Sequence, residues 1–80
     1  MKKIYVMIKC ERGQAYRVAA DIVEQVPEVS EVDSISGQYD LIAKFYLDDS
    51  VDVGHFVTER VQTVDGIRET FSLMTFNAFL

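Results

Sequence analysis

The spacing of apolar residues constrains this chain more than any other feature, because it switches between two periods along the sequence. Four segments place apolar side chains at every second position, as strands do: residues 3–10, 29–36, 39–47 and 67 to about 78. Residues 14–26 and a segment that begins near Asp52 place apolar side chains three or four positions apart, as amphipathic helices do. The predicted order of elements is therefore β-α-β-β-α-β.

Residues that start or interrupt regular structure fall between these segments. Pro27 disfavours helix at the residue before it and so ends the first helix. A glycine-containing turn at residues 36–38 joins two of the strands into a hairpin. Residues 48–50 offer capping oxygens to the second helix, whose predicted first turn contains Asp52, and Gly66 follows the end of that helix.

A weak internal repeat supports this order, since residues 26–32 align with residues 64–70. Each half of the chain then forms one β-α-β unit. Two interleaved right-handed units give a four-stranded antiparallel sheet with both helices on one face, so we predict an α+β, ferredoxin-like fold. A chain of 80 residues is long enough for one domain only, and residues 1–80 are predicted to form a single domain.

The composition excludes several classes of protein. A formal net charge of -5 argues against a nucleic-acid-binding surface, which is normally basic. The single cysteine, Cys10, excludes an intramolecular disulfide and a multi-cysteine zinc site. No apolar run approaches the roughly 18 residues of a membrane span, and no secretory segment precedes the first strand, so we predict a cytoplasmic protein without membrane contacts.

Large apolar side chains occur on both faces of the predicted strands. Alternating sets are Tyr5 and Met7 against Ile4, Val6 and Ile8; Ile42 and Tyr46 against Leu41, Phe45 and Leu47; and Met74 and Phe76 against Phe71 and Leu73. Two helices cover only one face of a sheet, and the other face is polar in a protomer that stays alone in water. We therefore predict that a second copy packs sheet against sheet to form a dimeric α-β barrel, with the aromatic segment 76–80 contacting that copy.

Residues 32–45, which run from Val32 through Gly37, Tyr39 and Asp40 to Phe45, resemble the central hairpin of the effector-binding (RAM) domain of Lrp/AsnC transcription regulators. The Val-Pro-x-Val before the second strand and the Gly-Ile-x-x-Thr-x-Ser-Leu of the last strand are similar to that family as well. The similarity covers essentially the whole chain. Members that bind DNA carry an amino-terminal helix-turn-helix, whereas this chain begins at the first strand, so it looks like the stand-alone version.

The resemblance implies a homodimer that assembles into higher rings, an octamer or similar, with a free amino acid bound between neighbouring dimers. Such a module modulates transcription through ligand-dependent assembly, without direct DNA binding, and has full-length Lrp/AsnC-type regulators as possible partners. Its predicted ligand-binding residues are Gly37, Gln38, Tyr39, Asp40, Thr70 and Ser72. Backbone N–H groups at a glycine turn suit a carboxylate, and Asp40 suits an α-ammonium group. Gln38 stands where the family frequently has an acidic residue.

Chemical sites of other kinds receive weaker support. The cluster of Asp48, Asp49, Asp52 and His55 contains metal-ligand types, but acids at a helix start suit the helix dipole and no second His or Cys completes a site. Cys10 is interpreted as a small buried hydrophobe. Since no P-loop, nucleophile elbow or dinucleotide fingerprint is present, we predict no metal, no cofactor and no catalysis.

Two alternatives with the same order of elements remain open. A small dimeric α-β barrel enzyme of the monooxygenase or isomerase kind would use a cavity between helices and sheet, and a buried His55 or Tyr46 in that cavity would favour it. An ACT-type regulatory domain would pair edge to edge rather than face to face, so the mode of sheet contact separates it from the first hypothesis.

Overall fold

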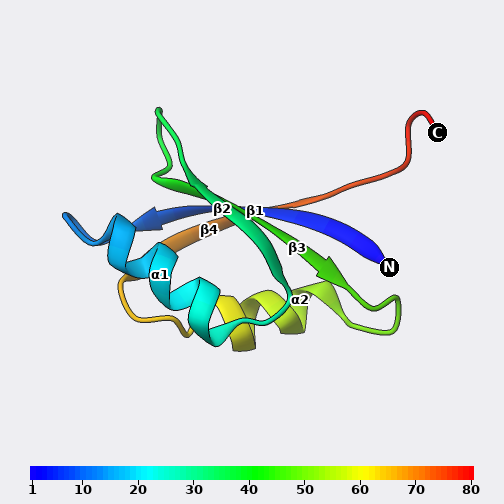
Figure 1. Cartoon of the computed structure of the whole chain (residues 1–80), viewed down its shortest axis with the longest axis horizontal. Helices are drawn as coiled ribbons and strands as arrows, with labels where there is room; N and C mark the ends of the chain where they lie inside the picture. The colour runs from blue at the N-terminus through cyan, green and yellow to red at the C-terminus, as the bar shows by residue number, and fades with distance from the viewer.

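Four antiparallel strands form one sheet, and both helical segments lie on the same side of it, in the computed structural model of residues 1–80 (Figure 1). The elements are β1 (Lys2–Cys10), α1 (Ala15–Gln25), β2 (Val29–Ser34), β3 (Leu41–Leu47), α2 (Val53–Phe56), a π-helical turn η1 (Val57–Val61) that continues α2, and β4 (Ile67–Met74). The strand order β2-β3-β1-β4 is that of two interleaved β-α-β units. The predicted fold class is therefore confirmed.

The core lies between the sheet and the helices and is wholly apolar. All 15 buried residues are hydrophobic, and no polar or charged side chain is buried. The strands contribute alternate residues, and Phe45 packs edge to face on Phe56 with ring centroids 5.2 Å apart. The strand members of the core are Ile4, Val6, Ile8, Cys10, Leu41, Ala43, Phe45 and Leu47. The sequence left open which of the two alternating sets faces the helices, and in β1 and β3 it is the set that contains Ile4 and Leu41.

The internal repeat has a structural counterpart. Val26 follows α1 and Val64 follows η1, and both are buried at the point where the chain turns back toward a strand. β2 and β4 each start three residues after the equivalent valine, at Val29 and Ile67. Both of these strands lie at the edges of the sheet, as the pseudo-symmetry of the fold requires.

Two predicted boundaries are wrong near the hairpin and the second helix. The strands of the hairpin end earlier and start later than predicted, leaving a loop at residues 35–40 that Ile35 N–H closes by donating to Asp40 O (3.0 Å). Asp52 is the N-cap of α2 rather than a first-turn residue, because its carboxylate accepts a hydrogen bond from His55 N–H. The periodicity also gave no sign of the π-helical turn η1.

The last strand also departs from the prediction. β4 ends at Met74, which pairs with Ile4, and not near Ala78. β1 itself begins two residues earlier, at Lys2, but beyond Met74 the chain makes only a side-chain contact with it, in which the Thr75 hydroxyl donates to the carbonyl of Lys3. Residues 75–80 extend away from the sheet (Figure 1). A bulge between Lys9 and Cys10 places Ile67 opposite Cys10, on the helix side. Unbroken alternation over the predicted strand from residue 67 would put Ile67 on the same face as Phe71 and Leu73, so that expectation is wrong by one position.

Candidate functional site

The face of the sheet away from the helices carries a group of large apolar side chains. The strand register aligns Met7 with Ile42 and Phe71, and it aligns Tyr5 with Leu73. Three of the patch residues are largely exposed: Tyr46 (41%), Phe71 (51%) and Leu73 (38%). We call Tyr5, Met7, Ile42, Tyr46, Phe71 and Leu73 the outer-face patch. Met74, which the sequence left on either face, pairs with Ile4 and lies on the helix side.

Charged side chains lie within and beside the outer-face patch. The Lys44 ammonium lies 5.6 Å from the centroid of the Tyr46 ring and 4.0 Å from a carboxylate oxygen of Glu31. Tyr46 and, to a lesser extent, Tyr5 and Glu31 raise the pKa of Lys44 above its ordinary value. The ammonium of Lys3 lies 6.0 Å from the Tyr5 ring. The patch therefore combines apolar surface with cations held against aromatic rings.

The hairpin loop brings four of the predicted ligand residues together. Gly37 adopts a φ of 104°, a conformation that side-chain-bearing residues rarely adopt. The backbone N–H groups of residues 36–39 make no hydrogen bond within the protein. This loop thus presents a run of free donors, as the anion-binding interpretation of the sequence requires.

Asp40 is fixed at the base of the same loop. Its Oδ2 accepts a 2.7 Å hydrogen bond from Cys10 N–H, and its own N–H donates to Ile8 O at 2.8 Å. Its other carboxylate oxygen accepts no hydrogen bond. Tyr39, the preceding residue, stacks on Phe71 with ring centroids 6.2 Å apart. The loop is therefore connected both to the end of β1 and to the outer-face patch.

The two hydroxyls of the predicted site lie elsewhere. Thr70 and Ser72 pair with Ile8 and Val6, whose side chains are in the core, so both hydroxyls are on the helix side of the sheet. The Thr70 hydroxyl accepts a hydrogen bond from Gln62 Nε2 at 2.8 Å. Within one protomer these two residues do not share a face with Tyr39.

A hollow of about 310 Å³ adjoins Asp40 where α1 begins. Arg12 and Tyr16 line it together with Asp40, and no hydrogen bond or ion pair engages the Arg12 side chain. Neither Arg12 nor Tyr16 is among the ligand-binding residues predicted from the sequence. The signal was available in the topology, because antiparallel pairing of β1 with β3 puts the end of one strand beside the start of the other. The complete lining is Cys10, Glu11, Arg12, Gly13, Ala15, Tyr16 and Asp40.

Cys10 contributes to this region through its backbone rather than its sulfur. The thiol is buried, and burial, with a smaller effect of the Asp40 charge, raises the pKa of Cys10 above its ordinary value of 9.0. A neutral, buried thiol is a poor nucleophile. The prediction that Cys10 is a small core residue is confirmed.

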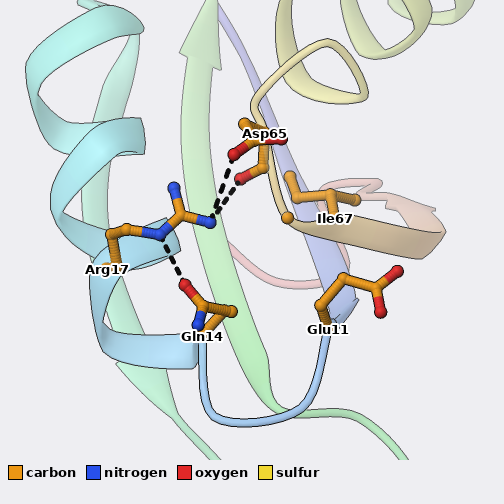
Figure 2. A pocket seen from close by; sticks show the side chains of 6 residues that line it. Glu11, Gln14, Arg17, Asp65 and Ile67 are labelled. Atoms are coloured by element: carbon orange, nitrogen blue, oxygen red, sulfur yellow. Dashed lines mark hydrogen bonds and ion pairs between the residues drawn. The ribbon is translucent and has the colours of Figure 1, made fainter.

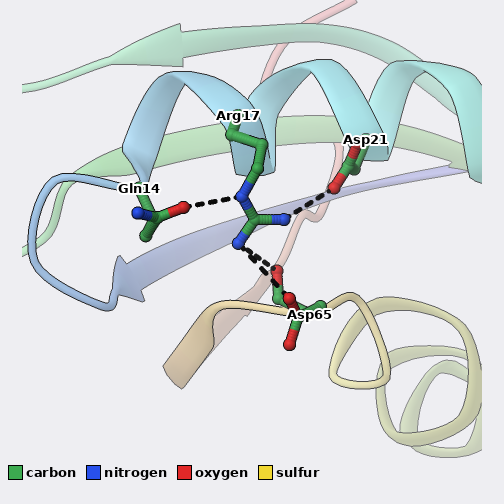
Figure 3. A network of polar contacts seen from close by, with 4 residues as sticks. All are labelled: Gln14, Arg17, Asp21 and Asp65. Carbon is green, nitrogen blue, oxygen red and sulfur yellow. Dashed lines mark hydrogen bonds and ion pairs between the residues drawn. The ribbon is translucent and has the colours of Figure 1, made fainter.

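A second hollow, of about 590 Å³, lies between the start of α1 and the loop before β4 (Figure 2). Its cation is already neutralised, since the Arg17 guanidinium bonds Gln14, Asp21 and Asp65 (Figure 3). Gly66 adopts a φ of 95°, and a Cβ atom there would come within 2.5 Å of Arg17 Nη2. These contacts join α1 to the loop before β4, so their role is to hold the fold together.

Two acids of the cluster before α2, Asp48 and Asp52, accept hydrogen bonds from nearby backbone N–H groups, and the third, Asp49, lies 3.5 Å from the amino terminus. Asp48 Oδ1 accepts hydrogen bonds from the backbone N–H and hydroxyl of Ser50, and these bonds lower the pKa of Asp48. His55 is exposed, with Nδ1 3.8 Å from Asp52 Oδ2. Tyr46 is also exposed, on the outer face. The buried His55 or Tyr46 that would favour the enzyme alternative is therefore not found. None of the helices combines the length and apolar character needed to cross a bilayer.

Comparison with known proteins agrees with this geometry. The model of the Lrp/AsnC ligand binding domain matches residues 3–80. An uncharacterised HTH-type transcriptional regulator of Pyrococcus abyssi is 27% identical over 67 residues, which cover 84% of this chain and 45% of the relative. The chain therefore spans less than half the length of that regulator.

Solved structures give the same result. A Thermus thermophilus protein superposes with a TM-score of 0.88 at 30% identity, covering 100% of this chain and 99% of that one. A transcriptional regulator of Neisseria meningitidis, solved as its L-Met complex, has the same fold with a TM-score of 0.81 at 18% identity, covering 99% of this chain and 52% of that one. With the match over residues 3–80, these findings show that the chain belongs to the Lrp/AsnC ligand-binding domain family.

Proposed function

We propose that this chain binds a free amino acid at its hairpin loop and couples that binding to assembly of sheet-to-sheet dimers into larger rings. Its effect on transcription would then pass through its assembly with other subunits, including full-length regulators of the same family. A surface with a net charge of -5 is unsuited to DNA, so we expect these residues to make no nucleic-acid contacts of their own. The cytoplasmic location stays a prediction.

The hairpin loop is the observation that carries the amino-acid proposal. An amino acid needs donors for its carboxylate and an acceptor for its ammonium group. Residues 36–39 offer N–H groups that nothing else uses, and Asp40 offers a carboxylate oxygen that accepts no other bond. The unpaired Arg12 in the adjoining hollow is a further group for the carboxylate. The L-Met complex of the Neisseria meningitidis regulator, which shares the fold, is consistent with this ligand class.

The outer-face patch supports the dimer. Removal of Phe71 and Leu73 from water by a partner stabilises the dimer by roughly 25 cal/mol for each Å² of apolar surface buried. A second copy offers an identical patch, and face-to-face packing covers both at once. Because Tyr39 stacks on Phe71, the same packing would restrain the ligand loop. Phe76 and Phe79 remain exposed in one protomer and are expected to contact the second copy.

We propose that Thr70 and Ser72 contact the amino acid bound by a neighbouring dimer and not the one bound by their own chain. Both hydroxyls lie on the helix side of β4, away from Tyr39 of their own chain. They would reach an amino acid held by a loop that belongs to another dimer of the ring. Ligand binding that needs two dimers favours the assembled state by mass action.

The test is isothermal titration calorimetry with the twenty amino acids, followed by the variant Asp40→Asn. An Asn at this position keeps an oxygen for the Cys10 N–H and removes only the charge. We expect at least one amino acid to bind, and Asp40→Asn to weaken that binding about 100-fold while the protein stays folded. Asp49→Asn, which changes an exposed acid elsewhere, should bind like the wild type.

A complete panel without heat or thermal shift would remove the sensing role, and equal binding by wild type and Asp40→Asn would remove Asp40 from the site. The mode of dimer contact distinguishes the remaining ACT-type alternative. An edge-to-edge dimer would leave the outer-face patch accessible to solvent, whereas the proposed dimer covers it.

A further inference from the structure

Helix α1 has a second apolar stripe that packs on nothing in the protomer. Its core stripe is formed by Val18 and Ile22, which are buried. On another side of the helix, Tyr16 is 77% exposed, Val23 is 60% exposed, and Ala20 is exposed between them. Positions i, i+4 and i+7 lie along one line of a helix surface. The stripe is therefore a continuous surface with a small residue at its centre.

The charges of α1 have the opposite order to the one that the helix dipole favours. No acidic residue occupies the first turn, which contains Arg17, and no basic residue occupies the last turn, which contains Glu24. The N-cap, Gln14, makes no capping side-chain hydrogen bond. Arg12, just before the helix, and Glu24 have no hydrogen-bond or ion-pair partner in the protomer. One end of this surface thus carries the unpaired positive charge of Arg12, and the other end carries the unpaired negative charge of Glu24.

We propose that this stripe binds α1 of a second copy, antiparallel and around a two-fold axis near Ala20. In that arrangement each Tyr16 ring lies against Val23 of the other copy, and the small Ala20 side chains let the two helices approach closely. Each Arg12 comes within reach of Glu24 of the other copy, on both sides of the axis. The surface is self-complementary in charge, and this identifies the occupant as a second copy of the chain.

This contact rests on the proposed function, because the units it joins are the sheet-to-sheet dimers. One pair of helices buries too little surface to hold two free protomers together. Repeated around a ring, however, each further contact forms within one assembly and is strengthened by its effective concentration. Two different two-fold contacts, one through the outer-face patch and one through α1, generate such a ring.

The α1 contact also adjoins the proposed ligand site. Tyr16 and Arg12 line the same hollow as Asp40. A second copy placed on the stripe closes that hollow from outside and sets its own Glu24 beside Arg12. The guanidinium of Arg12 has five N–H donors, so it can hold Glu24 of the neighbouring copy and the carboxylate of an amino acid together, and this shared contact makes binding and ring formation depend on each other.

Charge reversal tests the contact through the mass of the assembly, measured by sedimentation without ligand. Arg12→Glu and Glu24→Arg each place like charges together, and each should raise the concentration needed for assembly beyond the dimer by about tenfold or more. The double variant Arg12→Glu/Glu24→Arg restores opposite charges and should assemble like the wild type. Glu59→Arg, an equal reversal on exposed η1, is the control.

A wild type that stays dimeric at all concentrations would overturn the α1 contact and leave the sheet-to-sheet dimer standing. A wild type that stays monomeric would defeat the dimer itself. Single reversals that assemble normally, or a double variant no better than either single one, would also overturn the α1 contact.

Cross-linking gives a second measurement that does not depend on charge. In a Cys10→Ser background, Ala20→Cys places one thiol on each copy beside the two-fold axis, close enough for a disulfide. Mild oxidation should link the chains in pairs through residue 20, and Thr58→Cys on η1 should not link. Equal linking by both variants, or none by either, would contradict the geometry.

Discussion

The two faces of the sheet are built from the same strands but end in different states. Toward the helices, Val6, Ala43 and Phe45 are completely buried. Away from the helices, neighbours one position along the same strands, such as Met7 and Tyr46, retain contact with water. Successive strand residues point to opposite faces, so the difference is due to the layer that covers each face and not to the strands themselves.

The difference shows which part of the molecule is complete. The covered face has an apolar core, and no buried side-chain nitrogen or oxygen lacks a hydrogen-bond partner. The outer face carries the large apolar side chains of the outer-face patch among charged ones such as Lys44 and Glu69, and no second layer covers it in the protomer. Folding of the protomer should therefore depend on the first face and association on the second, and substitutions on each face can test that separation.

The largest loss of stability is expected from a substitution on the covered face. Phe45→Ala removes a ring that packs against Phe56 from a fully buried position. The loss of buried surface and the resulting cavity should reduce the free energy of unfolding by about 3–5 kcal/mol. Denaturant unfolding at fixed protein concentration measures this change. Phe71→Ala, which truncates a phenylalanine on the outer face, should reduce the free energy of unfolding of the protomer clearly less. Equal reductions by the two variants would contradict the idea that folding depends on the covered face and association on the outer face.

The second largest effect is expected on the stability of the dimer. Phe71→Asp places a charge in the outer-face patch, on edge strand β4 and directly opposite Met7. Burial of an unpaired carboxylate is so unfavourable that the dimer should weaken about 100-fold or more. Light scattering coupled to gel filtration should give the mass of one chain, while circular dichroism should remain that of the folded protein. Glu69→Asp, beside the patch on the same strand, should remain dimeric.

The smallest effect is a difference in pH dependence at the edge of the covered face. Because the folded state raises the pKa of Cys10, the stability of the wild type is fully retained below the unfolded-state pKa and falls as the pH rises through the folded-state pKa. Cys10→Ala removes this ionisation. As the pH rises above the ordinary, unfolded-state pKa of 9.0, the wild type should lose more stability than the variant in parallel denaturant titrations. Identical pH profiles would place this thiol in water.

The fold follows from the sequence to a large extent because each covered strand alternates regularly. Ile4, Val6 and Ile8 fix one face of β1, and Pro27 ends α1 where expected. Details that depend on contacts between residues far apart in the chain cannot be predicted from the local sequence pattern. The bulge at Lys9 and Cys10 depends on pairing with β4, and it reverses the apparent side of Ile67.

The candidate site divides in the same way. The loop from Gly37 to Asp40 is contiguous in sequence, so its resemblance to the family and its turn chemistry identify it directly. Arg12 and Tyr16 lie near Asp40 only because β1 and β3 are neighbours, and a scan along the chain gives no such proximity. The side on which Thr70 and Ser72 lie was likewise fixed by the register of β4.

Sedimentation velocity of the unmodified chain over a dilution series is the most direct test of the central claim, that a second copy covers the outer-face patch. The predicted result is a dimer or larger assembly down to micromolar concentration, with no folded single chain detected. A well-folded protomer that sediments as one chain at that concentration would contradict the claim.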